Sequence, residues 1–182
     1  MLLSANTHPY PQLARLTVER LLKNQPLPSS GIEVAEETSL WNEPRACFVS
    51  IKTKRGDLRG CIGTILPVQA SLDQEIIANA ISASTRDPRF TPMTTAELGN
   101  VVFSVDVLSL PETITDRTML DPAVWGVIIS KNGRRGLLLP DLEGVDTVDQ
   151  QIAIAAQKAG IDDLSGAVFE RFRVDRYKES EA

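Results

Sequence analysis

The sequence predicts an α+β protein, with mixed or antiparallel sheets and flanking helices. Helical and strand-like hydrophobic patterns follow one another in mixed order along the chain. Two pairs of strand patterns are each joined by a short turn, which indicates antiparallel hairpins rather than a doubly wound parallel sheet. The length of 182 residues favours one domain or two closely packed lobes.

The first elements are a helix and a hairpin. A helix is expected from Pro11 to about residue 24, because proline suits an early helical position and leucines recur at helical spacing. The stretch NQPLPSSG then ends it. Residues 46–52 (ACFVSIK) and 58–65 (LRGCIGTI) are typical of strands, and the turn at Arg55-Gly56 predicts an antiparallel hairpin.

A second helix and a further strand follow. Residues 71–84 carry one apolar stripe, and Ser71 with Gln74 fits a capping box. Glu75, in the first turn of this helix, is expected to be solvated. Residues 101–109 (VVFSVDVLS) alternate between apolar and polar, so they predict a strand with one buried face.

A second hairpin is predicted around Asn132-Gly133, because this dipeptide favours a tight turn between strands at 125–130 and 135–139. The stretch NGRRGLLLPDLEG lacks the glycine-rich turn and Lys-Ser/Thr pair of a phosphate loop, so we predict no nucleotide site there. Arg134 and Arg135 are expected to form the polar shoulder of the hairpin.

The chain closes with a helix and a strand. Thr147 and Gln150 fit a capping box, and Gly160 stands where a left-handed residue ends a helix. A last strand is expected within VFERFRVDRY (168–177), followed by a loose tail.

Composition argues against several classes of function. The 19 basic and 24 acidic residues give a net charge of −5 without a long block of one sign, so nucleic acid is not an expected partner. No stretch approaches about 18 apolar residues, so no membrane span is expected. The start MLLSANTHPYPQ lacks a basic region followed by an apolar run. We therefore expect a cytoplasmic location.

The cysteine and histidine content argues against disulfides and metal. Cys47 and Cys61 are too few for a disulfide framework, so reduced thiols are expected. His8 is the only histidine, and no Cys, His and carboxylate residues cluster at metal-ligand spacing. We predict no metal and no cofactor.

The first candidate site is LRGCIG at residues 58–63. Side chains alternate along a strand, so Arg59 and Cys61 would share a face with their Cα atoms about 6.5–7 Å apart. A guanidinium at this distance favours a thiolate, which makes Cys61 a candidate nucleophile. If Arg55-Gly56 is a two-residue turn, Ser50 lies opposite Cys61 and Cys47 points to the other face.

Two glycines flank this cysteine and have two interpretations. Gly60 and Gly63 weaken a strand interior, which is useful where a bulge forms or where a ligand or another backbone comes close, so both are candidate binding residues. The alternative is that Cys61 is a small core residue and that the glycines make room for packing against the second helix.

The second candidate site is the loop TRDPRFTP, which follows the second helix. Arg86 and Arg89 could bind an anionic substrate, and Asp87 could orient a polar group near the thiol. The alternative is an Asp-Arg ion pair that closes the loop. Asp106, on the polar face of its strand, is a weaker candidate for substrate binding.

Three stretches resemble the AMMECR domain family: LRGCIG, NAISASTRDPRF and GRRGLLLPDLEGVDTVDQQIAIAAQKAGI. The resemblance runs in order from about Leu13 to Tyr177, so residues 1–182 are interpreted as a single AMMECR domain. It implies an α+β fold of two unequal lobes, each built on a sheet with helices, around a cleft near LRGCIG.

The resemblance also implies partners without implying a reaction. Bacterial and archaeal relatives are associated with a radical S-adenosylmethionine protein and with a Memo-like protein that resembles extradiol dioxygenases. This chain cannot be the radical enzyme, because its two cysteines, fourteen positions apart, cannot provide the usual ligands of an iron–sulfur cluster. Relatives of the eukaryotic type often have a histidine before the Asn-Gly hairpin, where this chain reads WGVII.

Two functions follow as hypotheses. The first is a cysteine-dependent enzyme that acts on a small polar or anionic molecule, with Cys61 as nucleophile, Arg59 lowering the pKa of the thiol, and Asp87 or Arg89 positioning the substrate. The second is a non-catalytic adaptor or binding subunit that delivers a substrate to, or receives one from, the radical S-adenosylmethionine protein or the Memo-like protein.

Overall fold

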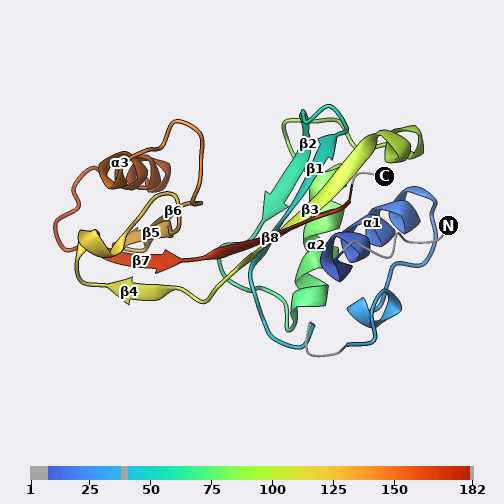
Figure 1. Cartoon of the computed structure of the whole chain (residues 1–182), viewed down its shortest axis with the longest axis horizontal. Coiled ribbons are helices and arrows are strands. Elements are labelled where there is room, and N and C mark those ends of the chain that lie inside the picture. Colours follow the sequence, from blue (N-terminus) through green and yellow to red (C-terminus); the bar gives the residue numbers. More distant parts are fainter. Residues whose placement is uncertain (1–7, 38–40, 181–182) are drawn as a thin grey trace. The chain divides into compact units, whose positions relative to one another are not determined.

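The computed structural model describes residues 8–37 and 41–180, which form two compact units (Figure 1). Unit 1 comprises Met1–Val107 and Arg176–Ala182, and unit 2 comprises Leu108–Asp175. Each unit has its own four-stranded sheet and its own apolar core. The helices and antiparallel sheets confirm the predicted α+β class.

The predicted helices and strands are present with small shifts in their ends. The helices are α1 (Pro9–Leu22), α2 (Leu72–Thr85) and α3 (Val148–Ala159). The strands are β1 (Cys47–Thr53), β2 (Leu58–Gly63), β3 (Val101–Leu108), β4 (Glu112–Ile114), β5 (Gly126–Lys131), β6 (Arg134–Leu138), β7 (Val168–Phe172) and β8 (Val174–Lys178).

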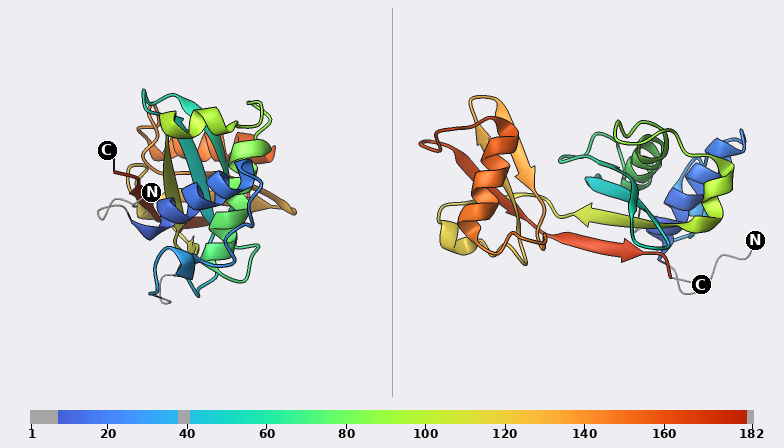
Figure 2. Two further views of the ribbon diagram at one scale, coloured as in Figure 1. Left: turned by 90° about the vertical axis from the view of Figure 1, so that its right-hand side faces the viewer. Right: turned by 90° about the horizontal axis from the view of Figure 1, so that it is seen from above.

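In unit 1 the strand order is β2-β1-β3-β8, and β1 pairs antiparallel with both β2 and β3. Helices α1 and α2 pack against each other, and α2 packs against β1 and β2 (Figures 1 and 2). Val49, Ile51 and Phe103 are fully buried in this core. Because side chains alternate along a strand, the residues between them face away from the core.

In unit 2 the strand order is β4-β7-β5-β6, and α3 packs against β5 and β6 (Figure 2). Val127, Ile129 and Ile152 form the centre of its core. The hairpin predicted at Asn132-Gly133 is confirmed, with both residues at positive φ. Such φ values at both turn positions give a turn whose twist matches that of the strands.

The predicted helix caps are confirmed for α3 and wrong for α2. Thr147 and Gln150 form the capping box, and Gly160 ends α3 in the left-handed region. At α2, the Ser71 side chain makes no capping bond to the helix. Asp73 takes that place, because its carboxylate accepts hydrogen bonds from the Gln74 amide at 2.8 Å and from the Gly31 amide at 2.9 Å.

The last predicted strand is in fact two strands. The tail after it was expected to be loose, but it is held by hydrogen bonds up to Glu179. The run 168–177 contributes β7 to the sheet of unit 2 and β8 to the sheet of unit 1. The Glu179 amide donates to the Phe103 carbonyl at 3.0 Å, and its carboxylate accepts from the Phe103 amide and from Arg15, each at 2.8 Å. These bonds fasten the segment to β3 and α1.

Helices α1, α2 and α3 are too short to cross a bilayer, and no helix in the described part of the chain is long and apolar enough to do so.

Candidate functional site

The β1–β2 hairpin positions Cys61 as the sequence predicts. Ser50 pairs with Cys61, and the Ser50 hydroxyl donates to the Cys61 Sγ over 3.1 Å. The turn, however, is longer than two residues. The register shifts by one residue between Ile51, which pairs with Gly60, and Lys52, which pairs with Leu58. Arg59 is therefore the extra residue of a β-bulge.

The two cysteines occupy different environments. Cys47 is fully buried in the core of unit 1, and burial raises the pKa of its thiol to about 12. Cys61 is half-buried. Since Val49 and Ile51 face the core, alternation places Ser50 and its partner Cys61 on the opposite face of the sheet. Cys61 is therefore the thiol with access to solvent.

Asp87 joins the TRDPRFTP loop to the backbone of Cys61. Its side chain is 2% exposed, and its Oδ2 accepts a hydrogen bond from the Cys61 amide at 2.9 Å. Arg89 donates from Nε to Oδ1 at 2.9 Å and from Nη2 to Oδ2 at 2.7 Å. The Asp-Arg ion pair that the sequence left as an alternative is thus present, and its bonds hold the pKa of Asp87 well below the ordinary range.

Together these two side chains cap an open edge of the sheet. Strand β2 is at the end of its sheet, so its outward amide and carbonyl groups lack a neighbouring strand. Asp87 accepts from the Cys61 amide, and Arg89 Nη2 donates to the Cys61 carbonyl at 3.2 Å. The ion pair therefore makes the two hydrogen bonds that another strand would make at this residue.

Arg89 is the cation that contacts Cys61 directly, through the Cys61 carbonyl, and one face of its guanidinium is exposed to solvent. Its side chain is 54% exposed although Asp87 holds it from behind. The hydrogen bonds that Arg89 donates to Asp87 raise the pKa of Arg89, so the guanidinium is charged at any physiological pH. Asp87, in turn, is a poor proton acceptor because its carboxylate is already engaged and its pKa is lowered.

Arg59, the cation that the sequence placed beside the thiol, is paired elsewhere. Its Nε lies 2.6 Å from Glu97 Oε1, and its Nη2 donates to the Thr91 carbonyl at 2.9 Å. The hydrogen bond from Arg59 Nε lowers the pKa of Glu97. Arg59 and Arg89 both lie against the Phe90 ring, with guanidinium carbons 5.8 and 5.6 Å from its centroid.

The glycines of LRGCIG are explained by close packing. A Cβ atom on Gly60 would overlap the carbonyl oxygen of Ala83 in α2. A Cβ on Gly63 would overlap the Phe48 ring, which lies on the paired residue of β1. At Gly60 the structure therefore shows the alternative interpretation, in which the glycine makes room for packing against the second helix.

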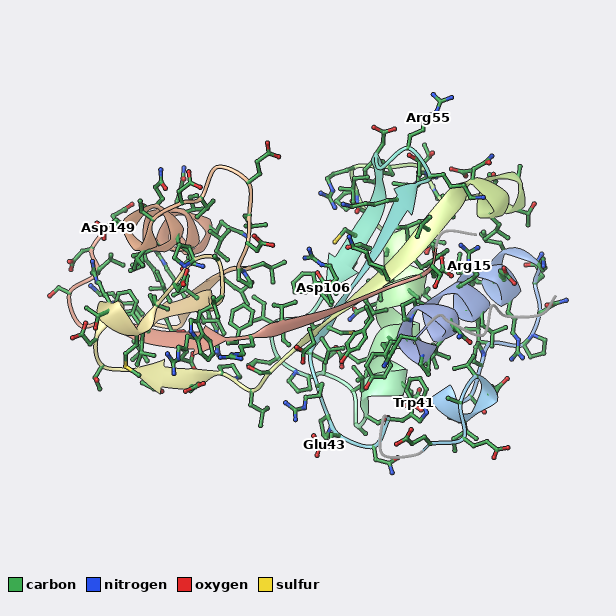
Figure 3. The ribbon with its side chains drawn as sticks, viewed as in Figure 1. Arg15, Trp41, Glu43, Arg55, Asp106 and Asp149 are labelled. Atoms are coloured by element: carbon green, nitrogen blue, oxygen red, sulfur yellow. The ribbon has the colours of Figure 1, made fainter. Side chains whose placement is uncertain are left out.

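The other candidate residues lie apart from this hydrogen-bond network. Arg86 is exposed at the end of α2. Asp106, which is labelled in Figure 3, is buried on β3. It forms a two-fold ion pair with Arg176 of β8, at 2.8 and 2.9 Å. Arg176 was missed, because its pairing with Asp106 depends on a strand far away in the sequence.

Two further residues were missed or misjudged from the sequence. Ser104 pairs with Ser50 on β1, so Cys61, Ser50 and Ser104 form one row across three strands. Glu75 is not solvated as expected, because it is fully buried and accepts hydrogen bonds from the Val68 and Gln69 amides at 3.0 and 2.8 Å. It orders the loop between β2 and α2.

Metal ligation has no support within residues 8–37 and 41–180, where no group of three His, Cys, Asp or Glu side chains could hold an ion. What the site can do follows from its donors. A fixed guanidinium with an open face, a hydroxyl and a half-buried thiol suit an anionic or polar ligand with an electrophilic centre.

These features define an α+β protein of two sheet-based units, with a half-buried cysteine on a capped edge strand. Residues 11–182 match the AMMECR1 family. The chain belongs to this family, as its motifs indicate.

Similar proteins occur in bacteria and archaea. A protein of Thermotoga maritima is 46% identical over 172 residues, which cover 94% of this chain and 98% of that protein. A protein of Clostridium acetobutylicum is 47% identical over 173 residues, which cover 94% of this chain but only 36% of that longer protein. The crystal structure of the uncharacterised protein PH0010 from Pyrococcus horikoshii has a TM-score of 0.79 at 27% identity, covering 93% of this chain and 89% of that one.

Proposed function

We propose that this protein binds a small anionic molecule on the outward face of β1 and β2, with Cys61 as the nucleophile. One observation carries the proposal. Arg89 is anchored on the buried Asp87 and on the Cys61 carbonyl, and yet its guanidinium stays half-exposed. A cation held in this way beside a thiol recognises a carboxylate or phosphate without first losing side-chain freedom.

The surrounding groups support attack by sulfur. The Ser50 hydroxyl, which donates to Sγ over 3.1 Å, stabilises negative charge on the sulfur, and the charge of Arg89 acts in the same direction. Asp87 does not serve as the base, since hydrogen bonds from Arg89 lower its pKa. The thiol proton would therefore pass to solvent or to the substrate. Asp87 acts by positioning Arg89 and the Cys61 backbone.

The test compares two alkylating reagents of similar size and different charge. Iodoacetate is an anion and iodoacetamide is neutral, so their rate ratio at Cys61 measures recruitment of an anion independently of general thiol reactivity. One positive charge near the thiol should raise the rate with iodoacetate, relative to the rate with iodoacetamide, by about fivefold. This factor corresponds to the roughly 1 kcal/mol of attraction between two unit charges in contact in water. The rates are read by mass spectrometry on the native protein, with buried Cys47 as the internal control.

Two arginine variants make the test specific. Arg89→Gln should remove the preference for iodoacetate, whereas Arg86→Gln, which removes the same charge on the other side of Asp87, should retain it. The proposal fails if Cys61 reacts only after unfolding, or if both variants change the ratio equally.

We also propose that the chain is AmmeMemoRadiSam system protein A, and that it acts with a radical S-adenosylmethionine protein and a Memo-like protein. The three family motifs in their order support this assignment. The non-catalytic adaptor remains the second candidate function. It is favoured by the Clostridium acetobutylicum relative, in which the matching region is only 36% of a longer protein.

The partnership is tested with purified proteins from the same organism. Isothermal titration of the chain with each partner should show saturable binding. If the adaptor function is right, Cys61→Ser should leave this binding unchanged, and no substrate should be consumed by the chain alone. Absence of binding to both partners would contradict the partnership and leave the small-molecule proposal to its own test.

A further inference from the structure

Unit 2 contains a pocket of about 610 Å³ at its β5–β6 hairpin. This volume is within the range of small-molecule sites. The pocket is lined by Ser130, Lys131, Asn132, Gly133, Arg134, Arg135, Ser165, Gly166 and Val168. This lining holds three cations and no carboxylate, in a protein whose net charge is −5. An excess of positive charge against the sign of the whole chain indicates an anionic ligand.

Two donors in this lining have no acceptor. The Ser130 hydroxyl and the Arg135 Nε are buried, and neither has a hydrogen-bond partner among the residues that the structure describes. They belong to directly paired residues of β5 and β6, so both donors come from one place on the sheet. A buried donor without an acceptor costs free energy, which a ligand oxygen at this place would recover.

The cations are held in position by groups around the pocket. Lys131 pairs with Asp163 at 2.8 Å, Arg135 pairs with Glu170 at 2.7 Å, and Arg134 donates to the Gly160 carbonyl. These contacts fix the side chains, while three positive and two negative groups leave an excess of one positive charge. The Asp163 side chain is 73% exposed, so its pairing with Lys131 is weakened by water.

The backbone of the pocket is also open to a ligand. Gly133 and Gly166 both have positive φ, and a Cβ atom on either would meet nothing within 4 Å. The glycines are therefore required by the conformation of the turns, and the space beside them is free. A ligand can approach the main chain closely at both positions.

We propose that this pocket binds the phosphate group of a small phosphorylated molecule. A phosphate has several acceptor oxygens at tetrahedral angles, so it can accept from Ser130 and from Arg135 at the same time. The side chains of Lys131 and Arg134 alternate to the other face of the hairpin, so they add positive charge at longer range. The rest of the volume accommodates an uncharged polar part, such as a sugar. The proposed site differs from a phosphate loop, because its donors come from a hairpin rather than from a helix N-terminus. It is independent of the function proposed for Cys61.

The test is a titration of the full chain followed by amide chemical shifts. Ribose 5-phosphate and inorganic phosphate are the probes, with succinate and sodium chloride at equal ionic strength as the carboxylate and salt comparisons. We expect saturable shifts at the amides of Asn132, Gly133 and Gly166 with the two phosphates only. Equal shifts with succinate would contradict the proposed preference for phosphate and show that the pocket binds anions in general. Equal shifts with sodium chloride would contradict the proposed binding site.

Variants separate binding from folding. Ser130→Ala removes a hydroxyl without a described partner, so the thermal midpoint should not fall, while ribose 5-phosphate should bind roughly tenfold more weakly. Lys131→Gln should also weaken binding. Its matched control is Lys54→Gln, an exposed lysine in the hairpin turn of unit 1. The proposal is wrong if Ser130→Ala binds like the unchanged protein or if both lysine variants lose affinity equally.

Discussion

The hairpins of the two units solve the same packing problem and differ in their polar groups. In unit 1, Gly60 of β2 lies against the carbonyl of Ala83 in α2. In unit 2, Gly136 of β6 lies against the carbonyl of Ala155 in α3 in the same way. Both glycines are preceded by an arginine, and in each unit the absence of a Cβ lets the helix approach the strand at backbone contact distance.

The difference begins beyond the glycine. In unit 1, Cys61 follows, and its amide and carbonyl are both occupied by the Asp87–Arg89 pair. In unit 2, Leu137 follows and is buried, whereas the polar groups beside it, on Ser130 and Arg135, lack partners within the described chain. Both units hold buried donors without a described partner, Arg59 Nη1 in unit 1 and the groups of Ser130 and Arg135 in unit 2. The comparison therefore teaches that the two hairpins differ at the residue after the glycine, where only unit 1 uses an ion pair to position a candidate reactive residue.

The largest loss of stability is expected when a methyl group is added to either of the two packed glycines. Gly60→Ala and Gly136→Ala each force a strand away from its helix, because the new Cβ would meet a backbone carbonyl rather than a side chain that can move. We expect a loss of about 3 kcal/mol in unfolding free energy for each. Urea denaturation followed by circular dichroism measures it.

The control for these variants is Gly99→Ala, since a Cβ there would meet nothing within 4 Å. Its unfolding free energy should change by no more than about 0.5 kcal/mol. If only one of the two hairpin variants is destabilised beyond this control, the packing of the two units is not equivalent.

The Asp87–Arg89 ion pair of unit 1 should give a pH-dependent contribution to stability. Asp87→Asn keeps an acceptor for the Cys61 amide but loses the charged bonds to Arg89, at a cost of about 2 kcal/mol at pH 7. Hydrogen bonds from Arg89 lower the pKa of Asp87 in the folded state. The contribution is therefore complete above the pKa of about 3.9 of an unfolded aspartate and is lost as the pH falls below it.

The measurement is the difference in unfolding free energy between the unchanged protein and the variant from pH 7 to pH 3. This difference should narrow as the solution becomes acidic. Asp57→Asn, at an exposed position in the turn between β1 and β2, should stay within about 0.5 kcal/mol throughout. A difference that is constant with pH would contradict a charged Asp87.

The smallest expected effect distinguishes the two helices that cover the hairpins. Thr147→Ala removes the capping hydroxyl of α3 and should cost about 1 kcal/mol. Ser71→Ala removes a hydroxyl that donates to Asp73 but caps no backbone amide, and it should cost less, about 0.5 kcal/mol, because Asp73 still accepts the bond from the Gln74 amide. Thermal denaturation of both variants checks the order, and an equal loss would show that Ser71 contributes to the cap.

The sequence predicted those parts of the fold that depend on local patterns. Hydrophobic periodicity and Asn132-Gly133 located the helices and the second hairpin, and alternation placed Ser50 opposite Cys61. β4 was missed because three residues carry too little periodicity. The division of the run 168–177 between two sheets was also missed, since pairing partners far away in sequence decide it.

The sequence pointed to the residues that the structure brings together at Cys61, but it predicted only some of their contacts. Motifs brought Cys61, Asp87 and Arg89 to attention, but Arg59 was chosen as the cation for the thiol from its distance along the strand. In the structure, a bulge and Glu97 decide the position of Arg59 instead. Both depend on residues outside the strand, so spacing within LRGCIG could not reveal them.

The carboxylate of Glu179 has a consequence for the order of synthesis. It joins Arg15 of the first helix to the amide of Phe103, and β8 beside it completes the sheet of unit 1. A ribosome must therefore translate all of Leu108–Asp175 before these contacts can form. During that interval the edge of β3 is uncovered, so the nascent chain has an exposed strand at the stage when chaperones bind such segments.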